Sequence, residues 1–574
     1  MKKSFIYFLL LCQYCLSPLK AQQDTWLKYE IKGDFSKQGE FKYTDSLQLE
    51  QFKRETLAEL HQLGYLTPVP IIKEHGDGQI LWIIFTGGKF EWLKIRRGNV
   101  DPVFLIKSGI DLRQFENQAV NYKDVALLFE KILKNSENQG YPFAAIRLDS
   151  LRRDQNRFEG ALDLDFGPFI TFDTLKITGD SRTKRQFLGN FLQIRPGEAF
   201  SQKKVVDGIR QVRNLPYLRW AGEPEISFQN EEATLYLPVN DRRINSIDGI
   251  IGFLPNELQG GRMLITGQFD LALYNVAGRG RNYELHWQRF NEFSQSLHVS
   301  ALEPLVLGSG IDIKASFSLL KEDTTFLTRD FKLDFGYRIG SNTYLSLFSR
   351  RQAGDLLDVS GLGELNRLPA VGDFRFNSYG AGFEQSWLDD RFFPRRGGLA
   401  NFEFSIGNKS ILINTAIPVE LYQGLDLRSL QYYFTGSFEK HFYWNSRWGL
   451  FSRLSGGVME NPNLFVNDLF RIGGLRTIRG FNENFFFANN FIFLNVEPRY
   501  YFDTYSYFMI FADVGRLDNK VQSLPTDFPY AAGMGFTLET GSVIFNFIYA
   551  LGGSNTQDFA LNLSKIHFGY TGRF

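Results

Sequence analysis

The residues that could do catalytic chemistry in this chain are scattered and lack the spacing of an enzyme site. The six histidines show no His-Glu-x-x-His pattern; they are His61, His75, His286, His298, His441 and His567. There is neither a Gly-x-Ser-x-Gly nucleophile elbow nor a Gly-Lys-Ser/Thr phosphate loop. Acidic pairs such as Asp389-Asp390 fall at expected turns, which leaves a hydrolase only as an alternative. We expect no enzyme, no cofactor and no metal site.

A different chemistry, ion pairing by an arginine, is indicated in the long connection spanning residues 460 to 488. Arg479 lies there between the glycine pair Gly473-Gly474 and the dipeptide Gly480-Phe481. Glycine lets a backbone bend and approach a wall closely, and Phe481 gives the loop a side chain to bury. We therefore expect this loop to fold inward instead of leaving Arg479 in solvent.

The expected partners of Arg479 lie on two stretches that alternate apolar and polar residues. One places Phe511, Asp513 and Gly515 on the face opposite the apolar side chains, and the preceding one does the same for Glu497. We expect Arg479 to form a bidentate, charge-assisted pair with Asp513, with Glu497 as a second partner. The alternative is that both acids only line a wet interior.

The first 21 residues are typical of a secretory signal peptide. Two lysines precede an apolar run over residues 5–16, and a small residue, Ala21, offers a cleavage site. Both cysteines, Cys12 and Cys15, lie inside this leader without the small preceding residue of a lipoprotein signal. The mature chain is therefore expected to carry no disulfide, thiolate ligand or lipid anchor.

Charge and hydropathy exclude two further classes. Lys plus Arg number 64 against 63 Asp plus Glu, so no net field favours nucleic acid. The chain carries 57 Phe and 25 Tyr, yet no later stretch has the roughly 18 consecutive apolar residues of a spanning helix. If the protein crosses a membrane, it must cross as a barrel.

The N-terminal part contains an internal repeat. Amphipathic helices are expected near residues 46–63, 123–138 and 201–215. Each ends at a chain breaker followed by tyrosine, and these tyrosines are spaced 76 residues apart: Tyr65, Tyr141 and Tyr217. The alternative is three unrelated helices of similar spacing.

These repeats predict three small α+β domains, each a strand, two helical segments and two further strands. We place them at residues 22–90, 91–168 and 169–243. The first copy is the least regular, because its leading strand runs into a Gly- and Lys-rich segment.

Residues 244–574 predict an all-β transmembrane barrel of sixteen strands. Alternating stretches of about ten residues replace the helical patterns there. The connections after strands 7, 9, 11 and 13 are long and those after even strands are tight, which is the asymmetry of a barrel with external loops. The last strand alternates apolar and polar residues and ends on Phe574.

Closure of this barrel must pair the first strand with the last. Gly249 and Gly252 interrupt the first strand, and glycine weakens strand pairing. We expect a seam between this strand and the one ending at Phe574 that can open and present an edge to an incoming strand. The alternative is that the glycines only relieve crowding where the strand leaves the third repeat.

Four motifs together resemble the BamA/TamA superfamily of outer-membrane proteins, in which POTRA domains precede a barrel. The resemblance covers essentially the whole mature chain and is closest to the TamA type. The motifs are Phe470-Arg471-Ile472-Gly473-Gly474 with Ile478-Arg479-Gly480-Phe481, then Phe511-Ala512-Asp513-Val514-Gly515, then Asp389 with Phe393-Pro394-Arg395-Arg396-Gly397, and Asn275 with Gly278-Arg279-Gly280.

The resemblance implies a factor in the bacterial outer membrane that inserts or translocates unfolded outer-membrane or exported polypeptides. Its three repeats would lie in the periplasm and capture clients by adding a strand to a sheet edge. The resemblance implies the same inward loop and the same partners for Arg479. A two-partner transporter for one exported substrate and a passive channel remain alternatives, and the sequence leaves open whether an inner-membrane or lipoprotein partner docks on the repeats.

Overall fold

The structure is a computed structural model, and it describes residues 25–75, 79–256, 262–289 and 293–574 except positions 341, 361, 365, 392, 446 and 542. The expected signal peptide lies outside the described residues. The chain forms two compact units. One holds the residues up to Thr171 with Ala199–Gln202, and the other holds Phe172–Glu198 with Lys203–Phe574.

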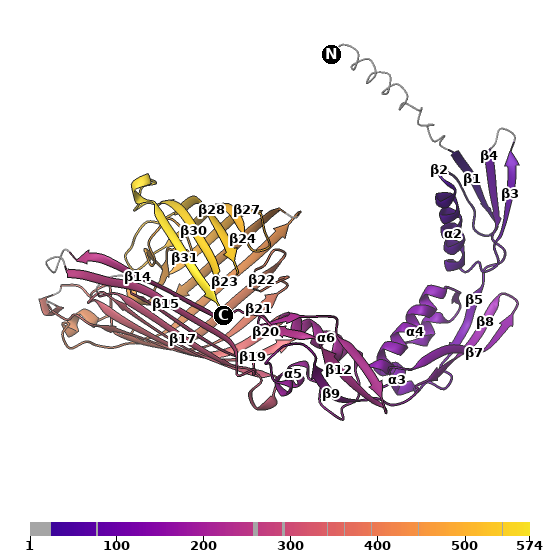
Figure 1. The fold of residues 1–574 in the computed structure, drawn as a ribbon, viewed down its shortest axis with the longest axis horizontal. Helices are drawn as coiled ribbons and strands as arrows, with labels where there is room; N and C mark the ends of the chain where they lie inside the picture. The colour runs from indigo at the N-terminus through magenta and orange to yellow at the C-terminus, as the bar shows by residue number, and fades with distance from the viewer. Residues whose placement is uncertain are drawn as a thin grey trace, which may run out of the picture. The chain divides into compact units, whose positions relative to one another are not determined.

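The first unit contains two α/β repeats (Figure 1). The first repeat is a sheet in the order β2-β1-β4-β3, with β1 parallel to β4, packed on one helix. Its core includes Leu27, Leu60 and Trp82. Its elements are β1 (Thr25–Lys32), β2 (Lys37–Tyr43), α2 (Ser46–Gln62), β3 (Val69–His75) and β4 (Gln79–Phe85).

The second repeat is a sheet in the order β6-β5-β8-β7. Helix α4 begins where the Asn121 side chain accepts the N–H of Lys123 at 3.0 Å, and it buries Leu128 and Ile132 against the sheet. The elements are β5 (Glu91–Arg96), α3 (Pro102–Lys107), β6 (Gln118–Ala119), α4 (Tyr122–Glu137), β7 (Ala145–Asp154) and β8 (Arg157–Asp165).

The third repeat belongs to the second unit, with the barrel. It has a sheet in the order β11-β12-β9 and a small pair β10-β13. The elements are β9 (Thr171–Ile177), α5 (Arg185–Leu192), α6 (Gln202–Arg213), β10 (Leu218–Trp220), β11 (Glu225–Gln229), β12 (Glu232–Leu237) and β13 (Val239–Asp241). The expected amphipathic helices are thus confirmed as α2, α4 and α6.

One detail of the expected repeat differs in its first copy. The second and third repeats have two helices between their first and last strands, whereas the described residues of the first repeat have strand β2 in place of the earlier helix. Polar residues alternate with Phe41 and Tyr43 along β2, and a period of two suits a strand that pairs with β1. Among the described residues, no helix combines the length and apolar character that a membrane crossing requires.

Sixteen strands close into an antiparallel barrel, as expected. They are β14 (Ser246–Asn256), β15 (Arg262–Val276), β16 (Arg281–Arg289), β17 (Gln295–Glu303), β18 (Ile311–Glu322), β19 (Phe326–Ile339), β20 (Thr343–Leu356), β21 (Phe374–Ser386), β22 (Gly397–Ile411), β23 (Arg428–Tyr443), β24 (Trp448–Glu460), β27 (Asn490–Tyr501), β28 (Tyr507–Asp518), β29 (Tyr530–Thr540), β30 (Val543–Gly553) and β31 (Lys565–Arg573).

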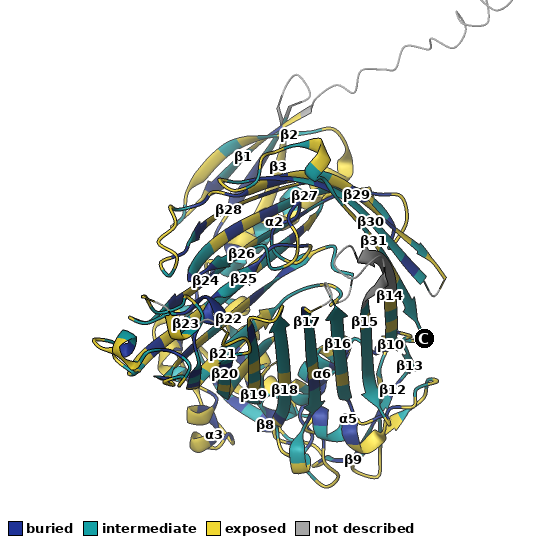
Figure 2. Ribbon diagram, turned by 90° about the vertical axis from the view of Figure 1, so that its left-hand side faces the viewer, coloured by how far each residue is buried: buried dark blue, intermediate teal, exposed yellow. Residues whose placement is uncertain are grey.

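Side chains alternate between the outer wall and the lumen along these strands, and exposed and buried residues alternate accordingly (Figure 2). On β31, Ile566 is 65% and Phe568 59% exposed. Such apolar side chains on the outside form the band that meets lipid. The connections after β20, β22, β24 and β28 are long, as the sequence predicts.

The third repeat is fixed to the short-turn end of the barrel. Asn275 donates a side-chain hydrogen bond to the Thr183 hydroxyl at 2.7 Å, and the N–H of Lys184 donates to the carbonyl of Gly278 at 2.7 Å. A Cβ at Gly280 would lie 2.3 Å from the ring of Phe187. The turn with Gly278 and Gly280 therefore needs its glycines to admit the third repeat.

Candidate functional site

The long loop between β24 and β27, residues 461–489, folds into the barrel; we call it loop six. It contains a small hairpin of β25 (Phe470–Ile472) and β26 (Phe486–Ala488). Its apolar side chains Ile478 and Phe481 are fully buried against the wall, in a cluster with Phe493 of β27. Burial of large apolar groups on a loop supplies the free energy that holds it inside.

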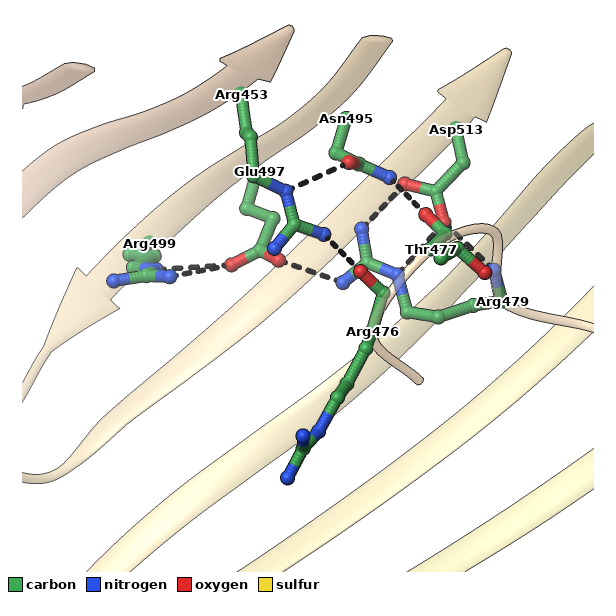
Figure 3. A network of polar contacts seen from close by, with 8 residues as sticks. All are labelled: Arg453, Arg476, Thr477, Arg479, Asn495, Glu497, Arg499 and Asp513. Atoms are coloured by element: carbon green, nitrogen blue, oxygen red, sulfur yellow. Dashed lines mark hydrogen bonds and ion pairs between the residues drawn. The ribbon is translucent and has the colours of Figure 1, made fainter. Parts of the chain in front are cut away.

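Arg479 is the polar centre of this contact (Figure 3). Its Nε donates to Oδ2 of Asp513 at 2.8 Å and its Nη2 to Oδ1 at 2.5 Å, a bidentate pair. Nη1 donates to Oε1 of Glu497 at 2.7 Å, and the backbone N–H donates to Asp513 at 3.0 Å. The guanidinium also lies over the ring of Phe511, 3.7 Å from its centroid. The structure thus brings together the residues that the sequence analysis placed in one site.

The charged state of Arg479 is favoured despite burial. Desolvation acts against the charge, but the hydrogen bonds to Asp513 and the charge of Glu497 outweigh it and raise the pKa of the guanidinium. Only arginine offers a planar fork that satisfies two carboxylates and a ring face at once. The site is therefore an ion-pair clamp that joins loop six to β27 and β28.

Further polar residues extend this clamp. Alternation along the strand of Glu497 also predicts Asn495 and Arg499 on the lumenal face, but not the contacts that they make. Oε2 of Glu497 accepts two bonds from Arg499, the shorter at 2.6 Å. Arg453 of β24 donates to Asn495 at 3.2 Å and to the carbonyl of Arg476 at 2.8 Å. Alternation of apolar and polar residues along β24 could have predicted that Arg453 faces the lumen. The sequence around Arg453 does not indicate that it binds loop six.

The glycines of loop six are required by conformation and space. Gly473 and Gly474 have φ of 131° and 85°, and a Cβ at Gly474 would lie 2.0 Å from the carboxyl group of Glu483. Gly480 has φ of 83°, and its Cβ would lie 2.5 Å from the backbone nitrogen of Gly552 on β30. Loop six therefore touches β30 backbone to backbone, a contact that the Gln557 side chain reinforces by donating to the carbonyl of Gly480 at 3.1 Å.

On the wall, Gly515 has a similar role. A Cβ there would lie 2.1 Å from the ring of Phe493, so glycine at this position lets that ring pack beneath loop six. Phe511 is buried and presents its face to Arg479. The wall residues thus shape a pocket for the loop and do not bind it through charge alone.

Gly480→Ala should displace loop six from β30. The variant combines an unfavourable positive φ, about 1–3 kcal/mol, with a backbone clash that no side-chain rotation relieves. We expect faster protease cleavage within residues 461–489 of the folded barrel. Gly424→Ala is the matched control, because Gly424 has φ of 85° and nothing within 4 Å of its Cβ position. Equal cleavage in both variants would contradict the close approach.

The seam between β14 and β31 is the second candidate site. Ser246 pairs with Arg573 and Ile247 with Gly572, and the N–H of Phe574 donates to the carbonyl of Asn245 at 3.0 Å. Among the described residues the two strands share no further backbone pairing, only a side-chain hydrogen bond from Thr571 to Asp248 at 3.5 Å. Their contact is therefore short and lies at the end next to the third repeat.

The glycines of the first strand pair with β15. Gly249 lies opposite Phe269 and Gly252 opposite Thr266. A Cβ at Gly249 would come no closer than 3.9 Å to any atom, and those atoms belong to β15. Crowding therefore does not account for Gly249. Within the described part of the chain, no group of three His, Cys, Asp or Glu side chains is arranged to hold a metal ion.

A closed sixteen-stranded barrel with an apolar outer band, preceded by small α/β repeats, defines an outer-membrane barrel protein with periplasmic POTRA-type domains. In a scan of family models, the Omp85 superfamily domain matches residues 275–574. The chain belongs to the Omp85 superfamily. The short turns next to the third repeat therefore lie on the periplasmic side, and the long loops lie outside.

Two solved structures, both of CdiB, show the same fold at low identity. CdiB from Acinetobacter baumannii is 12% identical with a TM-score of 0.57, covering 92% of this chain and 98% of that one. CdiB from Escherichia coli is 13% identical with the same coverage and TM-score. BamA from Haemophilus ducreyi lacking POTRA domains 1-3 is 15% identical with a TM-score of 0.43, covering 84% of this chain and 100% of that one. A search of curated proteins gives no match.

Proposed function

We propose that this protein inserts or translocates other polypeptides at the outer membrane, and that the seam between β14 and β31 is where clients engage. The observation that carries the proposal is the difference in strand pairing. β14 and β31 share two residue pairs, whereas β30 and β31 share eight and β14 and β15 share eleven. Each missing pair lowers the cost of separating the seam strands.

A partly unpaired seam offers an edge to a client. Backbone N–H and C=O groups along an open strand can bind an extended chain with little demand on its sequence. In a membrane such groups need a partner, because lipid cannot supply hydrogen bonds. An incoming strand would supply that partner.

Loop six has a complementary role in this proposal. Arg479 joins it to β27 and β28, and Gly480 and Phe481 seat it on β30 beside Gly552. The C-terminal wall is thereby braced from inside, which keeps β30 and β31 in place while β14 moves. The residues of the clamp, including Gly473, Gly474 and Gly515, act by positioning this wall.

The three repeats, at about residues 22–90, 91–168 and 169–243, would receive clients in the periplasm by strand addition. The sheet of the first repeat ends at β3, which exposes apolar side chains at Val69, Ile71 and Ile72. An exposed apolar edge strand is a template for pairing. By contrast, β7 of the second repeat is rich in charge and its register with β8 is interrupted between Asp149 and Arg152, features that discourage pairing.

Depletion of the protein, followed by quantitation of the outer-membrane proteome against total cell protein, tests the proposal. We expect several unrelated barrel or surface proteins to fall together and to recover when the wild-type chain is supplied from a second locus. Loss of one large exported protein would indicate a two-partner transporter. An unchanged proteome would contradict both and favour a passive channel or an outer-membrane enzyme.

A further inference from the structure

The periplasmic turn between β21 and β22, described at residues 387–391 and 393–396, is held together by its own carboxylates. One carboxylate oxygen of Asp389 accepts the N–H groups of Asp390, Arg395 and Arg396 at 3.0, 3.0 and 3.1 Å. The N–H of Asp389 donates to the carbonyl of Arg396 at 3.1 Å, and the N–H of Phe393 donates to Asp390 at 3.0 Å. A turn whose backbone donors are satisfied by its own side chains keeps its shape without help from neighbours.

The second half of this turn contacts the periplasmic ends of other barrel strands. Arg395 donates to the carbonyl of Thr504 in the turn between β27 and β28, and its guanidinium lies 5.2 and 5.4 Å from the ring centroids of Tyr443 and Tyr501. These contacts fix the base of the turn to the ends of β23 and β27.

The tip of the turn reaches the seam. The Phe393 ring centroid lies 4.5 Å from the guanidinium carbon of Arg573 on β31 and 5.6 Å from that of Arg242. Tyr505 packs on Phe393 with the ring centroids 4.6 Å apart. Asp390, next to this tip, forms an ion pair with Arg242 at 2.8 Å.

These contacts join parts of the second unit that are distant along the sheet. The turn connects the eighth and ninth barrel strands, whereas Arg573 belongs to the sixteenth. Arg242 lies in the segment that leads from the third repeat into β14. One aromatic ring therefore touches both the last strand and the entry to the first.

The ring of Phe393 stabilises the charge of the Arg573 guanidinium. Its Nε has no hydrogen-bond acceptor among the described residues, and its charge is otherwise met by Glu539 at 3.1 Å. The face of an aromatic ring stabilises such a partly desolvated cation. Arg573 is also one of the residues that form the short pairing between β31 and β14.

The geometry points to Phe393 as a positioning residue that holds the periplasmic end of the seam closed, through Arg573 on one side and Arg242 on the other. This inference rests on the proposed function, in which the seam opens for clients, and it names the residue that holds the seam closed until then. Movement of the third repeat would pull Arg242 away from Asp390 and Phe393, and the seam would lose its only aromatic clamp among the described residues. Client arrival at the repeats is thereby linked to release of the seam.

Spin labels across the seam test this role in the full chain reconstituted in lipid bilayers. Labels on Trp287→Cys and Phe545→Cys sit on the outer faces of β16 and β30 at positions that the strand registers align, about four strand spacings or 19 Å apart when the seam is closed. We expect Phe393→Leu to lower the ratio of closed to open populations about tenfold. Phe393→Tyr keeps the ring and should keep the wild-type ratio.

We call the contacts of Phe393 with Arg573 and Arg242 the latch. Two controls distinguish loss of the latch from destabilisation of the whole barrel. Phe348→Leu removes a buried ring that also faces a cation, Lys332 at 4.1 Å, on β20 away from the seam. Labels on Val299→Cys and Tyr379→Cys span four spacings of continuous sheet. An unchanged ratio in Phe393→Leu, or an equal change in either control, would overturn the inference. A seam that opens in Phe393→Leu while cells depleted of the protein keep their outer-membrane proteome would uphold the latch and refute the proposed function.

Discussion

Arg479→Ala should release loop six and destabilise the barrel by about 3–5 kcal/mol, because removing one partner of a buried ion pair leaves the other uncompensated. Asp513 is fully buried and would lose the two hydrogen bonds from the Arg479 side chain, keeping only the backbone N–H of position 479 as a donor from loop six. Glu497 would lose one bond but keep Arg499. The midpoint of urea unfolding in lipid vesicles, followed by gel mobility of the folded barrel, measures the loss.

The matched control is Arg516→Ala on β28, the strand that carries Asp513. Arg516 pairs with Asp518 at 3.4 Å with most of its side chain in solvent, and exposed pairs contribute about 0–1 kcal/mol. Arg479→Lys keeps the charge but not the fork, so it should fall between wild type and alanine. An Arg479→Lys protein that inserts, unfolds and functions like wild type would contradict the bidentate geometry.

A double variant separates charge from shape. Arg479→Met with Asp513→Leu removes both buried charges and leaves Glu497 to Arg499. We expect it to be more stable than Arg479→Ala, because replacing a buried pair by apolar groups avoids an orphaned charge. The stability that the double variant still lacks relative to wild type measures how much the ion pair contributes to holding loop six in the lumen.

The sequence could predict this clamp because its residues carry local signals. Alternation along β27 and β28 puts Glu497 and Asp513 on the lumenal face, and the glycines beside Arg479 indicate a close approach. Loop lengths and a period of two were enough to place sixteen strands. The same reasoning missed β2, whose short polar stretch has too few apolar residues to mark a strand.

Other contacts between distant segments could not be predicted. Arg453 and Gln557 join the clamp because the barrel closes, and their own neighbours in sequence say nothing about loop six. The motif at Asp389 and Phe393 marked a turn, but its reach to Arg573 depends on how the wall curves. Register and turn chemistry are local, whereas the choice of partner across a lumen is set by the whole barrel.

A disulfide across the seam should abolish function while leaving the fold intact. Thr571 donates to Asp248 at 3.5 Å, one position beyond the last paired residues of the seam, so these two side chains meet across the seam and are the natural positions for a cross-strand disulfide. Asp248→Cys with Thr571→Cys in the oxidised state would prevent β14 from leaving β31. The outer-membrane proteome should then fall to the level reached by depletion, and a reductant should restore it.

The control places the same cross-link within continuous sheet. Asn546 and Gly569 are partners on β30 and β31, and a Cβ at Gly569 would lie 3.6 Å from that of Asn546, which matches disulfide geometry. Both natural cysteines lie in the expected leader, so each engineered pair is expected to form the only thiols of the mature chain. Full function of the oxidised seam variant would mean that clients pass without separating β14 from β31. The lumen would then be the route, and Gly249 and Gly252 of the first strand would need another explanation.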